Sequence, residues 1–162
     1  MGFGLLATNA WRLLKVKLMP NSVSVETVRI DDTSPPVEKF IELRVLCGWG
    51  DLPHEVAERA LSNSIASLTA RDENNQVVGF VRVIGDELYL YIQDMIVDPD
   101  MRDQKLGKRI MDYLLPRLRA DYPHATIMLM CAKGRERFYA QFGFQVRPST
   151  NYGPGMYLVS QN

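Results

Sequence analysis

The hydrophobic positions of this chain recur with two spacings, and the changes between them separate predicted strands from predicted helices. The segment VSVETVRI, which starts at Val23, alternates apolar and polar residues and predicts a first strand. After the break DDTSPP, the segment VEKFIELRVLC has apolar residues at helical spacing, among them Phe40 and Leu43. Pro53 opens a second predicted helix, PHEVAERALSNS, directly after the Gly- and Pro-marked loop GWGDLP.

The second half of the chain continues the same alternation of patterns. IASLTARD and VVGFVRVI predict two strands joined by a turn at ENNQ, and LYLYIQDMIV is apolar on both faces, as in a buried central strand. KLGKRIMDYLLPRLRADY predicts an amphipathic helix with a kink at Pro116. TIMLMC predicts a buried strand, RERFYAQ a short helix capped by Gly143, and FQVRP and GMYLVS two final strands.

This order of elements predicts one α/β (α+β) domain. A mixed central sheet of six to seven strands would be flanked by about four helices. The domain would span residues 23–162, and residues 1–22 would form an N-terminal extension outside the core.

Composition narrows the classes of function. Hydrophobic residues make up 46% and charged residues 23% of 162, as in an ordinary globular domain, and Lys+Arg balance Asp+Glu at 19 each. We therefore expect no nucleic-acid partner, and no apolar run reaches the ~18 residues of a membrane span. Cys47, Cys131, His54 and His124 lack the spacing of metal ligands, so we expect no metal and a reducing, cytoplasmic location.

The loop MRDQKLGKR, between the predicted central strand and the amphipathic helix, is the clearest candidate site. The first turn of a helix presents unpaired N–H groups and the positive end of its dipole, which together attract an anion. Arg102, Lys105, Lys108 and Arg109 add four cations. The spacing fits neither a Walker loop nor a dinucleotide fingerprint. From these residues alone, the loop is an anion-binding helix start or a solvated, charged one.

The run IQDMIVDPDMRDQKLGKRIMDYLLPRL resembles the central motif of the GNAT superfamily of N-acetyltransferases. There a strand ending in V-x-P precedes R/Q-x-x-G-x-G/A and a helix. RFYAQFGF, ELRVLCGWG and GPGM extend the resemblance, which is closest to a small bacterial subgroup and covers residues 23–160. It implies transfer of acetyl from acetyl-CoA to a primary amine of a small molecule or peptide by direct attack. The implied cofactor-binding residues are Met95, Ile96, Val97, Arg102, Asp103, Gln104, Lys105, Leu106, Gly107 and Lys108.

Two positions depart from the family pattern. Lys105 replaces the first loop glycine, where lysine can offer its amide if the backbone is right-handed helical, and Ala132 replaces a frequent asparagine. These departures leave two alternatives open. One is a catalytically inactive acyl-CoA-binding module, and the other is an anion-binding interaction domain that binds no CoA.

The resemblance also implies catalytic roles. Tyr139 matches the family tyrosine beside the sulfur and would donate a proton to the leaving thiolate; alternatively it packs with Phe138 and Phe142. Asp94, on an apolar strand, is either the general base or a paired structural carboxylate, because Gln93 stands where some members carry a glutamate. Backbone N–H groups around Met95 to Val97 would bind the oxyanion.

The acceptor side of the site carries less information. Trp49, between two glycines, and Tyr152 are the candidate substrate-binding residues, although either aromatic ring could simply cover the core. Members of the family are often dimers, so the resemblance adds a homodimer to the expectations.

Overall fold

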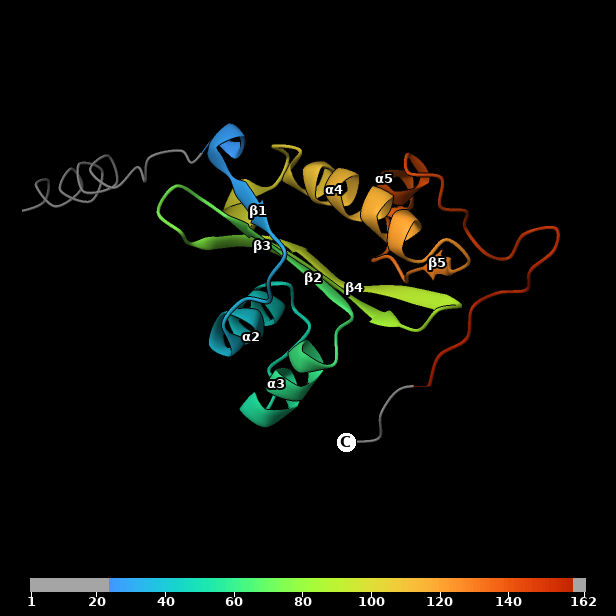
Figure 1. Cartoon of the computed structure of the whole chain (residues 1–162), viewed down its shortest axis with the longest axis horizontal. Helices are drawn as coiled ribbons and strands as arrows, with labels where there is room; N and C mark the ends of the chain where they lie inside the picture. The colour runs from blue at the N-terminus through green and yellow to red at the C-terminus, as the bar shows by residue number, and fades with distance from the viewer. Residues whose placement is uncertain (1–23, 159–162) are drawn as a thin grey trace, which may run out of the picture.

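The computed structural model describes residues 24–158 and has a twisted sheet between two layers of helices (Figure 1). The strands are β1 (Arg29–Asp31), β2 (Ala66–Arg71), β3 (Val77–Gly85), β4 (Tyr89–Val97) and β5 (Thr126–Met128). The helices are α2 (Val37–Leu46), α3 (His54–Ser62), α4 (Leu106–Asp121) and α5 (Glu136–Ala140), with two 3-10 turns, η1 (Val25–Thr27) and η2 (Pro99–Met101). The predicted extension, residues 1–22, lies outside the described residues.

The five strands are ordered β1-β2-β3-β4-β5, and only β4 and β5 run parallel. Helix α4 is the crossover between these two strands, as a parallel connection requires. α4 and α5 cover one face of the sheet, and α2 and α3 cover the other (Figure 1). The predicted α+β class and the order of elements as far as α5 are confirmed. Within residues 24–158, no helix has the length and apolarity to cross a membrane.

The number of strands is lower than predicted. FQVRP and residues 155–158 of GMYLVS form no strand, while Val159 and Ser160 lie outside the described residues. A strand is stable only when its N–H and C=O groups find a partner strand, and hydrophobic alternation does not supply one. The first predicted strand is also shorter, because Ser24 accepts a hydrogen bond from the Glu26 amide and starts the turn η1.

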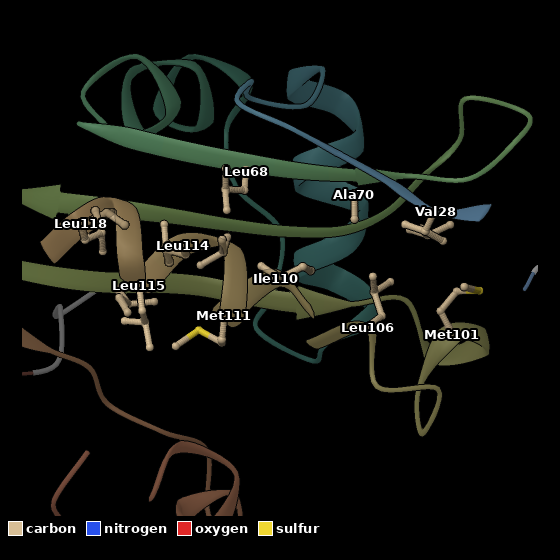
Figure 2. Close-up of a cluster of buried hydrophobic side chains, with 14 of the residues drawn as sticks. Val28, Leu68, Ala70, Met101, Leu106, Ile110, Met111, Leu114, Leu115 and Leu118 are labelled. Carbon is tan, nitrogen blue, oxygen red and sulfur yellow. The ribbon is translucent and has the colours of Figure 1, made fainter. Parts of the chain in front are cut away.

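Helix α4 forms the larger hydrophobic core with the sheet, as Figure 2 shows. The helix runs from Leu106 to Asp121 without interruption, so the kink predicted at Pro116 does not break it. A second core lies on the opposite face, where the rings of Phe40 (α2) and Phe80 (β3) pack edge to face at 5.5 Å. The side chains that α4 buries are Leu106, Ile110, Met111, Leu114, Leu115 and Leu118.

The close approach of α4 to β3 depends on Gly79. A Cβ atom at this position would lie 3.1 Å from Ile110 Cδ1 and 3.3 Å from Ile96 O. We expect Gly79→Ala to lower the free energy of unfolding by about 1–3 kcal/mol, because the added methyl overpacks this contact. Denaturant unfolding measures the change. Gly153→Ala is the matched control, since a Cβ there meets nothing within 4 Å, and an equal effect of both substitutions would contradict the argument.

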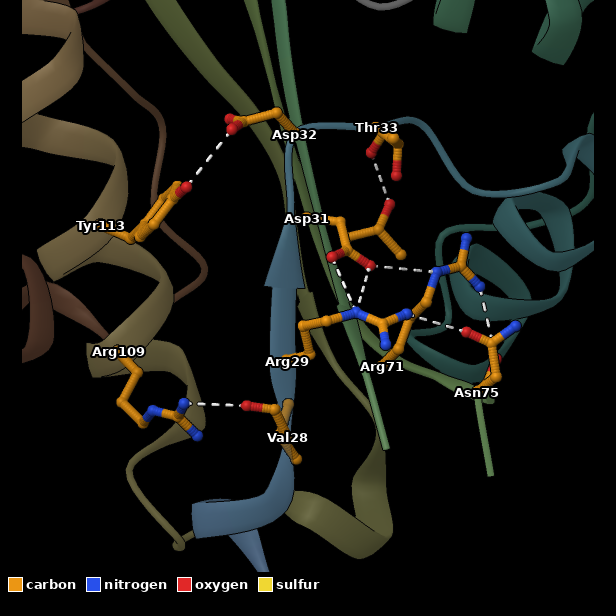
Figure 3. A network of polar contacts seen from close by, with 10 residues as sticks. Val28, Arg29, Asp31, Asp32, Thr33, Arg71, Asn75, Arg109 and Tyr113 are labelled. Carbon is orange, nitrogen blue, oxygen red and sulfur yellow. Dashed lines mark hydrogen bonds and ion pairs between the residues drawn. The ribbon is translucent and has the colours of Figure 1, made fainter. Parts of the chain in front are cut away.

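Edge strand β1 is fastened to α4 by polar contacts, shown in Figure 3. Arg109 of α4 donates to the carbonyls of Val25 and Val28, the latter at 2.9 Å, and Tyr113 donates to Asp32 at 3.3 Å. Arg109 therefore points to β1, and its charge does not contribute to an anion site at the start of α4.

Candidate active site

A cleft opens where β4 and β5 separate. Their pairing covers only three residue pairs, from Tyr89 with Thr126 to Tyr91 with Met128. Beyond it lies a cavity of about 940 Å³. Its walls are the second half of β4, residues 129–132, the start of α4, α5 and the end of α2. Among the described residues, no strand pairs with the part of β4 that lines the cleft, so the N–H and C=O groups on this side can bind a ligand.

A bulge in β4 shapes this wall. Phe80 pairs with Ile96 and Arg82 with Gln93, so two residues of β4, Asp94 and Met95, lie opposite one residue of β3. Asp94 has a φ of 49°, which is unusual for a residue other than glycine. Such an outlier next to a cleft is typical of functional sites. The bulge changes the face that β4 presents, so Ile96 packs in the α2 and α3 core and not in the cavity.

Asp94 is enclosed by two arginines. Its side chain is 3% exposed, one carboxylate oxygen accepts from Arg44 of α2, and the other accepts from Arg82 Nε at 2.5 Å. Arg44 also contacts the Trp49 ring, with 5.6 Å from its guanidinium carbon to the centroid. Both oxygens are engaged by cationic donors, which favours the paired structural carboxylate over the general base.

The start of α4 has the properties of an anion site. Lys105 at the N-cap makes no side-chain capping bond, and the first turn contains no acidic residue. Within residues 24–158, the amides of Leu106, Gly107 and Lys108 donate to no protein acceptor. Lys105 has φ 66° and ψ 12°, which is the left-handed conformation that glycine adopts most easily. Lys105 therefore does not have the right-handed helical backbone on which its place in the loop was expected to depend.

The cations near this helix start are not equivalent. Lys108 is paired with Asp112 at 2.6 Å, and Arg102 donates to Val97 O at 3.4 Å. Among the described residues, Arg102, Lys105 and Arg135 line the cavity without a carboxylate partner. Two carboxylates lie on the cavity wall: Asp94, which is paired with two arginines, and Asp103, which is exposed. The cavity therefore favours a ligand with several negative charges.

Tyr139 of α5 lies on the cavity wall. Its ring packs edge to face with Phe138 at 4.9 Å and with Phe144 at 6.0 Å. Burial raises the pKa of Tyr139 above its ordinary value, the nearby Cys131 adds to the rise, and Arg135 opposes it. The phenol is therefore protonated at neutral pH and can donate a hydrogen bond into the cleft.

Most of the residues that the sequence analysis selected meet in this cavity. Gln104 does not, because its amide donates to Asp100 O, and Ile96 and the 63%-exposed Tyr152 also lie outside it. Residues on the cavity wall that the sequence analysis passed over include Arg44, in the segment ELRVLCGWG, and Arg135, just before α5. The selected residues on the wall are Trp49, Asp94, Met95, Val97, Arg102, Asp103, Lys105, Leu106, Gly107, Lys108 and Tyr139.

No group of three or more His, Cys, Asp or Glu residues capable of holding a metal occurs between Ser24 and Leu158. Cys47 lies on the cavity wall, and burial raises the pKa of its thiol, while Arg102 beside it acts in the opposite direction.

A cleft between two parallel strands, bordered by an uncapped helix start and a tyrosine, is the arrangement that the family resemblance predicts. The chain belongs to the GNAT acetyltransferase family, because residues 50–160 match the family's acetyltransferase (GNAT) domain. Enzymes of this family use acetyl-CoA as cosubstrate.

Similar proteins agree with this assignment. The chain is 33% identical over 110 residues to the uncharacterized N-acetyltransferase ycf52 of Pyropia yezoensis and 32% identical to that of Porphyra purpurea. Each match covers 64% of this chain and 63% of the relative. A GNAT-family acetyltransferase of Streptococcus pneumoniae superposes with a TM-score of 0.65 at 25% identity, covering 84% of this chain and 98% of that one. A Staphylococcus aureus protein of unknown function superposes with a TM-score of 0.72 at 25% identity, and the match covers 82% of this chain and 99% of that one.

Proposed function

We propose that this protein is an N-acetyltransferase that transfers the acetyl group of acetyl-CoA to a primary amine of a small molecule or peptide. The observation that supports this most directly is the meeting of three features in one cavity. They are the uncapped start of α4, the unpartnered backbone of β4 and the protonated phenol of Tyr139.

The residues at the start of α4 fit a pyrophosphate. The free amides of Leu106, Gly107 and Lys108 and the positive end of the helix dipole attract an anion. Arg102 and Lys105 add positive charges that pair with no carboxylate of residues 24–158. A Cβ at Gly107 would lie 3.4 Å from Phe138 Cζ and 3.5 Å from Met95 Cε, so the missing side chain lets the start of α4 pack closely against both. The unpaired edge of β4 then offers hydrogen bonds to an extended chain that carries the acyl group.

Transfer itself requires a new bond from the amine nitrogen to the acetyl carbon and loss of the carbon–sulfur bond. Tyr139 donates its proton to the departing sulfur, and a backbone N–H of Met95 to Val97 stabilises the charge on the acetyl oxygen. Asp94, held by Arg44 and Arg82, positions the bulge and does not accept the proton. The amine loses one proton to solvent before it attacks, so it reacts in its neutral form, and its nitrogen loses a second proton to solvent as the amide forms. The Tyr139 phenolate, left after its proton has gone to the sulfur, takes up a proton from solvent.

The acceptor enters beside Trp49, which follows α2 and is 43% exposed at the cavity. Its ring, with Arg44 stacked on it at 5.6 Å, forms a flat wall for the acceptor's carbon skeleton.

Two measurements test the proposal. Titration calorimetry should detect acetyl-CoA binding, and its absence at tens of micromolar would contradict both the enzyme and the inactive acyl-CoA-binding module. Release of the CoA thiol in the presence of a panel of primary amines then separates these two. Binding without thiol release for any amine would favour the inactive module, and the departures at Lys105 and Ala132 make that comparison informative.

Lys105 provides a prediction about both stability and binding. Lys105→Gly should raise the free energy of unfolding by about 0.5–1 kcal/mol, because relief of left-handed strain exceeds the added chain entropy. Lys105→Asn also tolerates this conformation and removes the same charge. We expect both variants to bind acetyl-CoA roughly 3–10-fold more weakly, as a partly exposed charge on phosphate contributes about 1 kcal/mol. Tighter binding by Lys105→Gly would show that the lysine is only a steric obstacle.

A further inference from the structure

Two arginines from distant parts of the chain meet at the end of α2, on the wall of the cavity. Cys47 follows α2 directly, and its thiol lies close to Arg44 of α2 and to Arg102 of the loop before α4. Both guanidinium groups act to lower the pKa of this thiol, against the larger effect of burial. Arg44, Cys47 and Arg102 all line the cavity. The end of α2 therefore presents two guanidinium groups to a ligand.

Both arginines keep hydrogen-bond donors that the protein does not use. Arg44 donates to Asp94 from Nη1, whereas its buried Nε and its Nη2 meet no acceptor within residues 24–158. Arg102 donates to Val97 O from Nε at 3.4 Å, and its two Nη groups bond no oxygen in the described part of the chain. A guanidinium group matches the two oxygens of a carboxylate. The unused Nη groups of the two arginines can therefore hold one.

The charge at this end of the cavity is positive. Asp94 pairs with both Arg44 and Arg82, so these two arginines and Arg102 exceed it by two positive charges. In the part of the chain that the structure describes, the cavity wall has one further carboxylate, Asp103, which is exposed on the loop before α4. Such a wall repels a polyamine, which carries several positive charges, and attracts an acceptor that carries a negative one.

We propose that the acceptor is an amino acid, and that its free carboxylate binds between Arg44 and Arg102. The inference rests on the proposed transferase function and names the class of amine that the site takes. Arg44 holds Asp94, which is the neighbour of Met95 in the bulge of β4. A carboxylate at Arg44 therefore places an amine on the adjacent carbon close to the strand that binds the acetyl group. The 43%-exposed ring of Trp49 then lies beside the amino acid side chain.

A matched set of acceptors tests this class. Thiol release from acetyl-CoA is measured with the common amino acids, with their amides and with plain amines, spermidine among them. At least one amino acid should have a kcat/KM roughly tenfold or more above that of its own amide, as one charge-assisted hydrogen bond contributes that much. Amides or plain amines that react as well as the amino acids would overturn the inference and leave the proposed function standing. Thiol release with no acceptor at all would overturn the proposed function, and the inference with it.

Variants then locate the carboxylate through the ratio of kcat/KM for the amino acid to kcat/KM for its amide. Arg102→Gln should lower this ratio by about fivefold, and because Arg102 is exposed the fold is kept. Arg102 also favours acetyl-CoA in the proposed function, but a change in acetyl-CoA binding affects both acceptors equally and cancels in the ratio. Arg44→Lys keeps the positive charge beside Asp94 and loses the second nitrogen, so the ratio should fall here too.

Lys108→Gln is the matched control. Lys108 is a cation of the same cavity wall, but it pairs with Asp112 at 2.6 Å, so its substitution should leave the ratio unchanged. An unchanged ratio in Arg102→Gln would overturn the proposed place of the carboxylate. An equal fall in Lys108→Gln would also overturn it, because the preference would then come from the charge of the whole cavity and not from the two arginines.

Discussion

Replacing Tyr139 by Phe should lower kcat by about a hundredfold to ten-thousandfold, which is the usual contribution of a positioned general acid. The ring would keep its packing against Phe138 and Phe144, so stability and acetyl-CoA affinity should change little. A proton donor that acts only on the departing sulfur affects kcat and leaves KM for acetyl-CoA nearly unchanged. Steady-state kinetics by thiol release measures both constants.

The matched control is Tyr113→Phe on α4. Tyr113 bonds Asp32 at 3.3 Å and lies outside the cavity, so its substitution should not change kcat. An unaltered rate in Tyr139→Phe would remove Tyr139 from the mechanism and leave it as part of the aromatic packing around α5.

The pH dependence follows from the state of the phenol. A general acid works while it is protonated, below its pKa, and fails above it. Burial raises the pKa of Tyr139 above its ordinary value of 10.0, so the midpoint of the loss of activity from this group should lie above pH 10. The pH–rate profile of Tyr139→Phe should lack this alkaline decline. A decline that begins near neutral pH in the unsubstituted protein would contradict the assignment.

Asp94→Asn should lower the free energy of unfolding by about 3 kcal/mol. The change leaves Arg44 and Arg82 without their shared carboxylate. Breaking a buried ion pair in this way costs about 3–5 kcal/mol. Both arginines are partly exposed, so we expect a cost at the lower end of this range. The melting temperature should fall by roughly 6–12 °C. Asparagine tolerates the positive φ at this position, so the comparison isolates the charge.

Asp103→Asn is the control for this substitution. Asp103 also has a positive φ, 62°, but it is exposed and has no ion pair among the described residues, so its stability change should stay within about 0.5 kcal/mol. The same variants test the general base. If Asp94 only positions the bulge, the pH–rate profile of folded Asp94→Asn keeps its shape. If the fall in rate at acidic pH disappears in this variant, Asp94 is the general base after all.

The limits of sequence reasoning are visible in particular residues. The anion site at the start of α4 could be predicted, because the strand–loop–helix order and the basic residues are local. The Arg44–Asp94 pair could not, since its members are 50 residues apart and meet only when α2 packs on the sheet. Arg109 looked equivalent to Lys105, yet the fold turns it to the carbonyls of Val25 and Val28.

Local pattern determined the type and order of the elements, since the spacing of apolar residues decides which face of a helix or strand can be buried. Motif and periodicity together also determined the family and about half of the residues on the cavity wall. Tertiary structure decided the rest: the bulge at Asp94, the left-handed backbone of Lys105, and the absence of partner strands for residues 144–148 and 155–158 within the described part of the chain. These features depend on hydrogen bonds and packing between distant segments, which no local spacing of residues specifies.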